Sequence, residues 1–135
     1  MKKCFLIDDD AVFNLISSKM ILRTGMELET KTFVSAKLAI EEIREMSNQK
    51  EISPLCIFLD IRMPDMDGFS FLNELKKMPL QLQKMLHVYI LSSSLDQRDI
   101  VRSMSFELVK GFLTKPLEEA AVSKIMNEID KQQIN

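Results

Sequence analysis

The sequence predicts an α/β domain in which one parallel β-sheet lies between two layers of helices. Apolar runs of strand length alternate along the whole chain with stretches whose apolar residues recur at helical spacing. Strands that alternate with helices return parallel to one another through right-handed crossovers. The third run, Leu55 to Leu59, is apolar at every position, as expected of a strand buried on both faces.

Five strands are expected, each followed by a helix. The strands lie at Lys3 to Ile7, Leu28 to Phe33, Leu55 to Leu59, Val88 to Leu91 and Gly111 to Leu113. The second strand alternates polar and apolar residues, which is typical of an edge strand.

The helices are placed by helical spacing and by their end signals. The first is marked by Val12, Leu15, Ile16, Lys19, Met20 and Leu22 and ends at Gly25, and Asp10 is expected to cap it. The apolar residues of the next two are Leu38, Ala39, Ile43 and Met46, then Phe69, Leu72, Leu75 and Met78. The fourth carries Ile100, Val101 and Met104, and the fifth carries Leu117, Ala121, Ile125 and Ile129. The end signals are Ser35 capping the second helix, Pro79 stopping the third, Ser94 or Asp96 starting the fourth and Pro116 preceding the fifth.

Composition indicates one ordinary globular domain over residues 1–135. The chain is 46% hydrophobic and 28% charged, without a linker or repeat that would mark a domain boundary. A net charge of -2 argues against direct nucleic-acid binding. No apolar stretch is long enough for a signal peptide core or a membrane span, so a cytoplasmic protein without membrane insertion is expected. Cys4 and Cys56 fall in strand-like runs and are expected to be buried and free.

Polar residues gather where four of the predicted strands end. The first strand ends in Asp8-Asp9-Asp10, the third in Asp60, the fourth in Ser92-Ser93-Ser94 and the fifth in Thr114-Lys115-Pro116. In open parallel sheets, ligands bind outside the carboxyl ends of the strands. Carboxylates gathered there repel one another unless a cation compensates, and Mg2+ prefers oxygen ligands of this kind.

This set of residues has the parts that phosphoryl transfer requires. Lys115, the Ser92 hydroxyl and Mg2+ would neutralise the oxygens of a transferring phosphoryl group. Asp60 is the candidate nucleophile, because a carboxylate can form an acyl phosphate and this one ends the central strand opposite the acidic pair Asp8 and Asp9.

These residues, in this order along the chain, resemble the receiver domain of bacterial two-component response regulators. The resemblance rests on four motifs that span the chain: Asp8-Asp9, the run Asp60-Ile61-Arg62-Met63-Pro64-Asp65-Met66-Asp67-Gly68, Ile90-Leu91-Ser92-Ser93, and Phe112-Leu113-Thr114-Lys115-Pro116. It implies a flavodoxin-like (βα)5 fold, a three-layer sandwich with strand order 2-1-3-4-5.

The resemblance also implies a mechanism and partners. Asp60 would take a phosphoryl group from a phosphohistidine of a sensor histidine kinase or a histidine phosphotransfer protein. The Mg2+ ligands would be Asp9, Asp60, the backbone carbonyl of Arg62 and, through water, Asp8. Ser92 and Phe112 would form the conformational switch.

A single-domain regulator with no output domain would then be expected. It would have no enzymatic activity beyond accepting and slowly losing its own phosphoryl group. Its signal would pass to a downstream protein through the face made by the fourth helix, the fifth strand and the fifth helix. Arg62 departs from a simple match, because its side chain is long enough to contact the phosphoryl group or an exposed carboxylate.

Two other functions remain open at this stage. A haloacid-dehalogenase-like phosphatase would use Asp8 as nucleophile and Asp10 as acid, because Asp8-Asp9-Asp10-Ala11-Val12 matches that family's nucleophile pattern. A pseudo-receiver would keep the fold as a protein-binding module without phosphotransfer. The lone histidine, His87, is expected to be structural or exposed, which leaves no basis for a zinc site or a catalytic triad.

Overall fold

The computed structural model describes residues 2–93 and 96–134 and contains a five-stranded parallel sheet with the order β2-β1-β3-β4-β5. This order confirms the predicted topology and the edge position of β2. The strands are β1 (Lys2–Ile7), β2 (Leu28–Phe33), β3 (Leu55–Leu59), β4 (Leu86–Ser92) and β5 (Val109–Thr114). β4 and β5 extend beyond the predicted ranges at both ends.

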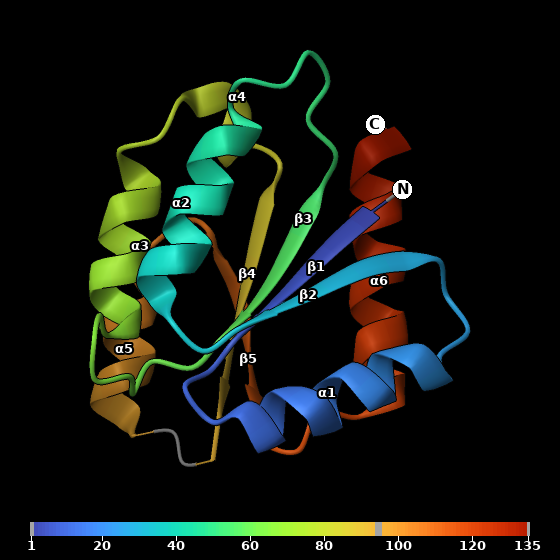
Figure 1. Cartoon of the computed structure of the whole chain (residues 1–135), viewed down its shortest axis with the longest axis vertical. Helices are drawn as coiled ribbons and strands as arrows, with labels where there is room; N and C mark the ends of the chain where they lie inside the picture. Colours follow the sequence, from blue (N-terminus) through green and yellow to red (C-terminus); the bar gives the residue numbers. More distant parts are fainter. Residues whose placement is uncertain (1, 94–95, 135) are drawn as a thin grey trace.

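Helices cover both faces of this sheet (Figure 1). They are α1 (Ala11–Arg23), α2 (Ala36–Met46), α3 (Gly68–Lys76), α4 (Leu80–Gln83), α5 (Gln97–Met104) and α6 (Glu119–Ile134). The fourth and fifth helices of the sequence prediction are therefore α5 and α6. Helices α2 and α3 pack on one face of the sheet, and α1 and α6 pack on the other (Figure 1).

The core is divided by the sheet into two clusters of buried side chains. Alternate residues of each central strand point to opposite faces, so that Ile57 joins the cluster under α2 and α3 while Phe58 joins the one under α6. All five residues of β3 are buried, as predicted. Cys4 and Cys56 are buried free thiols, which also agrees with the prediction.

The predicted first helix is present as α1, but most of the apolar residues that predicted it do not lie on its buried face. Val12, Leu15 and Leu22 are 65%, 55% and 78% exposed, whereas α1 buries Asn14, Ser17 and Ile21. Apolar residues occur all around this helix, so their spacing does not reveal which side faces the sheet. The buried side combines the polar residues Asn14 and Ser17 with the apolar residue Ile21.

Helix ends follow the expected signals. Asp10, Ser35 and Asp96 accept hydrogen bonds from backbone N–H groups in the first turns of α1, α2 and α5. Gly25 follows the end of α1 with a φ of 71°, a conformation that glycine adopts without strain. The alternative start of the fourth helix, Ser94, lies outside the described residues.

The region after α3 contains one helix that the sequence did not predict and settles the position of His87. Pro79 does end the third helix, but it also begins the short helix α4, which was not predicted and whose Leu82 is fully buried. His87 is 3% exposed, which supports its structural role and rules out an exposed position. Burial lowers the pKa of this imidazole, and the positive charge of Lys110 acts in the same direction.

In the part of the chain that the structure describes, no helix is both long and apolar enough to cross a membrane.

Candidate functional site

Backbone hydrogen bonds carry the sheet slightly beyond its strands and thereby position the site residues. The amide of Asp8 donates to the carbonyl of Phe33 at 3.0 Å, and the amide of Asp60 donates to the carbonyl of Ile7 at 3.0 Å. On the other side, the amide of Lys115 donates to the carbonyl of Ser92 at 2.9 Å. The side chains therefore project from rigid, hydrogen-bonded backbone at one edge of the sheet.

Three carboxylates meet at this edge, as the sequence predicted. Asp8, Asp9 and Asp60 each offer an oxygen within 4.8 Å of the others. Asp8 and Asp60 are buried, with 5% and 7% exposure, while Asp9 is exposed. Two of the three carboxylates are thus buried, and the third is open to solvent, on the side where a ligand can approach.

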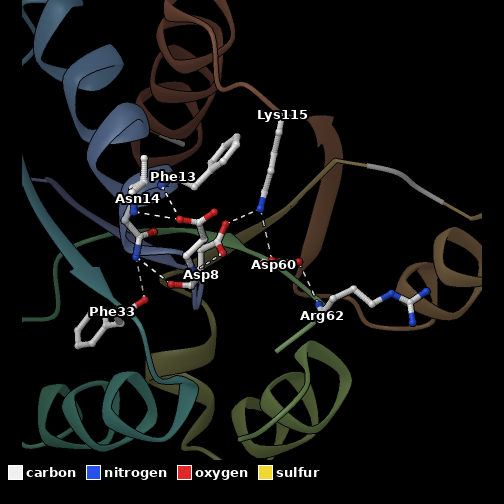
Figure 2. A network of polar contacts seen from close by, with 9 residues as sticks. Asp8, Phe13, Asn14, Phe33, Asp60, Arg62 and Lys115 are labelled. Atoms are coloured by element: carbon white, nitrogen blue, oxygen red, sulfur yellow. Dashed lines mark hydrogen bonds and ion pairs between the residues drawn. The ribbon is translucent and has the colours of Figure 1, made fainter. Parts of the chain in front are cut away.

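Lys115 supplies the positive charge of the site. Its Nζ lies 2.5 Å from Oδ2 of Asp8 and 3.4 Å from Oδ2 of Asp60, and all three side chains are at most 10% exposed (Figure 2). The same ammonium lies 4.2 Å from the ring centroid of Phe13, a cation-π contact that fixes it from the α1 side. The sequence predicted that Lys115 lies at this edge, but it did not predict the contact with Phe13.

Burial and neighbouring charges shift the pKa values of the two central groups. Burial raises the pKa of Asp60 above its usual range, because the charged form loses solvation. The backbone N–H of Arg62 and the ammonium of Lys115 oppose this rise, and the charge of Asp8 adds to it. For Lys115, burial alone would lower the pKa, but the hydrogen bond to Asp8 and the charges of Asp60 and Asp8 raise it. Lys115 is therefore protonated at neutral pH.

Asn14 is a buried member of the site that sequence reasoning missed. Its side-chain amide donates to the carbonyl of Asp8 at 2.9 Å and to the carbonyl of Phe33 at 3.1 Å (Figure 2). These bonds tie α1 to the ends of β1 and β2 and hold the backbone of Asp8. A polar residue within an apolar helix stretch was the available signal.

Asp10 caps α1 and does not face the centre of the site. Its Oδ1 accepts from the amides of Val12 and Phe13 at 3.0 and 3.2 Å. Its own backbone amide donates to Oδ1 of Asp8 at 3.0 Å, so the chain turns back toward Asp8 within the run Asp8-Asp9-Asp10. The cap role expected for Asp10 is confirmed.

The loop after β3 turns tightly around Asp60. The amide of Arg62 donates to Oδ1 of Asp60 at 3.0 Å, and the amide of Gly68 donates to the carbonyl of Ile61 at 3.1 Å. A Cβ at Gly68 would lie 2.6 Å from Cα of Ile61, so only glycine allows this approach. The Arg62 side chain leaves the acidic cluster and pairs with Asp99.

The two expected switch residues lie beside the site on β4 and β5. Ser92 is buried at the last position of β4 and pairs in register with Thr114. Phe112 is partly buried, packs against the core cluster under α2 and α3, and pairs with Ile90. Ser92 and Phe112 therefore lie on the two strands that flank α5 in the chain.

Known proteins resemble this chain over almost its full length. The chemotaxis protein CheY of Bacillus subtilis is 26% identical over 126 residues, which cover 93% of this chain and 95% of that protein. The structure of a response regulator receiver protein from Dyadobacter fermentans matches with a TM-score of 0.85 at 25% identity, covering 96% and 98% of the two chains. A two component response regulator from Cytophaga hutchinsonii matches with a TM-score of 0.81 at 28% identity, covering 97% and 98%.

The family assignment follows from these matches and from the residues at the strand ends. The sequence pattern of the response regulator receiver domain matches residues 4–127, which include the acidic cluster and Lys115. The chain therefore belongs to the response regulator receiver domain family.

Proposed function

We propose that this chain is the phosphoacceptor of a two-component or phosphorelay pathway and that Asp60 is the residue phosphorylated. The observation that carries the proposal is the arrangement of Lys115 between two buried carboxylates, 2.5 Å from Asp8 and 3.4 Å from Asp60, within a group of three carboxylates. This arrangement supports the proposal, because the carboxylates and the ammonium that the reaction would need lie close together at one edge of the sheet.

The reaction requires positioning and charge neutralisation more than proton transfer. A carboxylate oxygen of Asp60 attacks the phosphorus of a phosphohistidine, forming a P–O bond as the P–N bond breaks. The imidazole nitrogen of the donor leaves with the electron pair and takes up a proton from water. Lys115 favours the ionised form of Asp60 and is placed to balance the charge of the phosphoryl oxygens, while the amide of Arg62 orients the carboxylate.

The donor set fits Mg2+. This ion prefers oxygen ligands and takes one or two protein carboxylates together with water or phosphate oxygens. Asp9, Asp60 and the backbone carbonyl of Arg62 would hold the ion, and Asp8 would contact it through water. When bound, Mg2+ neutralises charge on the transferring phosphoryl group.

Signal transmission is assigned to Ser92 and Phe112. A phosphoryl group adds about -1.5 to -2 charges and three acceptor oxygens, and it would draw the Ser92 hydroxyl toward Asp60. Phe112, partly buried on the neighbouring strand, would then turn inward. We assign the docking of a downstream protein to the face formed by α5, β5 and α6. In this proposal residues 1–135 act as one receiver domain, and the signal passes by docking.

The phosphatase alternative is disfavoured by the position of Asp10. That mechanism needs Asp10 as a free acid, but its Oδ1 accepts from two amides of the first turn of α1.

Phosphorylation by acetyl phosphate tests the proposal. Wild-type protein, Asp60→Asn and Asp8→Asn are incubated with acetyl phosphate and Mg2+, and intact masses are compared. We expect one phosphoryl adduct on the wild type and none on Asp60→Asn. An adduct that is lost only in Asp8→Asn would favour the phosphatase, and no adduct on the wild type would favour the pseudo-receiver.

A further inference from the structure

An ion pair joins the loop after β3 to the first turn of α5. An Nη2 atom of Arg62 lies 2.5 Å from Oδ2 of Asp99. The Asp99 side chain is 13% exposed and that of Arg62 is 68% exposed. Figure 2 shows the Arg62 side chain directed away from Asp8, although its backbone amide contacts Asp60. The guanidinium nearest in sequence to the nucleophile is thus paired with a residue of another element.

Helix α5 depends on a few contacts of this kind. Of its eight residues, all of which the structure describes, only Ser103 is buried. A second tie is the guanidinium of Arg102, which lies 4.0 Å from the ring centroid of Phe69 on α3. Between these ties is a cavity of about 450 Å³ whose wall includes Arg62, Asp99 and Arg102. Because little apolar area holds α5, loss of one ion pair can loosen its first turn.

Arg62 is also able to reach a phosphoryl group on Asp60. Its amide lies 3.0 Å from Oδ1 of Asp60, so its side chain starts next to the carboxylate that would carry the group. The side chain is largely exposed and can change rotamer without displacing core residues. A guanidinium binds phosphate through two parallel hydrogen bonds, and a phosphoryl group carries more negative charge than the single carboxylate of Asp99.

We propose that Arg62 exchanges partners, pairing with Asp99 before phosphorylation and with the phosphoryl group on Asp60 afterwards. Asp99 is then a positioning residue that acts through Arg62, and the exchange releases the first turn of α5. This inference rests on the proposed function of Asp60. It gives this chain a direct electrostatic link between its nucleophile and α5, in addition to the link through Ser92 and Phe112.

The competition is reciprocal, so it can be measured from either side. Removing the charge of Asp99 frees Arg62 and strengthens binding at Asp60. Beryllofluoride, an analogue of the phosphoryl group, is titrated with Mg2+ into the wild type and Asp99→Asn. We expect binding about two- to five-fold tighter in Asp99→Asn, the range that a partly exposed ion pair supplies.

Two controls separate this exchange from a general loss of negative charge. In the background Arg62→Gln, Asp99→Asn should leave beryllofluoride affinity unchanged, because the shared cation is absent. Glu107→Gln removes an exposed negative charge just beyond α5 and should not alter the affinity in either background.

Amide hydrogen exchange reports on the release of α5. In the wild type, beryllofluoride should increase exchange at residues 97–101. In Arg62→Gln, exchange there should already be high and should not increase further. An Asp99→Asn affinity equal to that of the wild type, or an Asp99→Asn effect that persists in Arg62→Gln, would overturn the exchange while leaving Asp60 as the acceptor. Absence of beryllofluoride binding in every variant would overturn the proposed function and this inference with it.

Discussion

Replacement of Lys115 by methionine removes the cation from the acidic site while keeping most of the side chain's volume. The Nζ atom of Lys115 lies 2.5 Å from Asp8 and 3.4 Å from Asp60. At an effective dielectric constant of about 20, these separations correspond to gross attractions of about 7 and about 5 kcal/mol. Most of this attraction is offset, because the variant no longer buries an ammonium group and because the carboxylates can take up protons. We expect a net loss of about 3 kcal/mol in the free energy of unfolding at pH 7, near the lower end for removal of one partner from a buried ion pair.

The pH dependence of this loss has a defined sign. Burial and the charge of Asp8 already raise the pKa of Asp60, and Lys115 opposes them. Without Lys115 the pKa rises further, so the folded variant binds protons more tightly than the unfolded chain. Its stability then falls as pH rises above the usual carboxyl pKa of about 4, and the deficit at pH 7 shrinks at pH 5.

Urea unfolding of the wild type and Lys115→Met measures this deficit. The two proteins are compared at pH 7 and pH 5, with and without Mg2+. Mg2+ should recover part of the loss at pH 7, because it supplies the missing positive charge. A matched control is Lys131→Met, which removes an exposed lysine of α6. Equal stability of Lys115→Met and wild type at pH 7, or a deficit independent of pH, would refute this account of the site.

Three further substitutions test the interactions that hold the acidic site in place. Asp60→Asn should raise the free energy of unfolding at pH 7 by about 1 kcal/mol, because it removes a buried carboxylate whose pKa is raised, and urea unfolding measures the gain. Asn14→Ala should cost about 1–3 kcal/mol in the same assay, since buried carbonyls at the ends of β1 and β2 lose their donor; a loss below 0.5 kcal/mol would deny that role. Gly68→Ala should cost about 1–3 kcal/mol and slow phosphorylation by acetyl phosphate, because the new methyl group would overlap the backbone of Ile61; a fully active variant of unchanged stability would contradict the tight turn.

The sheet could be predicted from sequence because its signals are local. The strand β3 is apolar at every position and is followed at once by Asp60. Its burial and the position of the polar residue at its end can therefore be predicted from the sequence. Parallel strands then bring Asp8, Asp60 and Lys115 to one edge without knowledge of any contact.

The features that sequence did not reveal depend on contacts between distant residues. The inward face of α1 is defined by Asn14, whose amide completes hydrogen bonds of two strands, and apolar spacing carries no signal for that role. The pair of Arg62 with Asp99 joins residues 37 positions apart. Helix α4 is too short to show a period, and its single buried residue Leu82 looks like any loop leucine.

Locating the phosphoryl group within the chain tests directly whether Asp60 is the phosphoacceptor. The wild-type protein is treated with acetyl phosphate and Mg2+, the acyl phosphate is reduced with borohydride, and peptides are sequenced by mass spectrometry. Reduction converts a phosphorylated aspartate into homoserine. If Asp60 is the phosphoacceptor, homoserine is found at position 60 and at no other aspartate. Homoserine at position 8, or none in the chain, would contradict it.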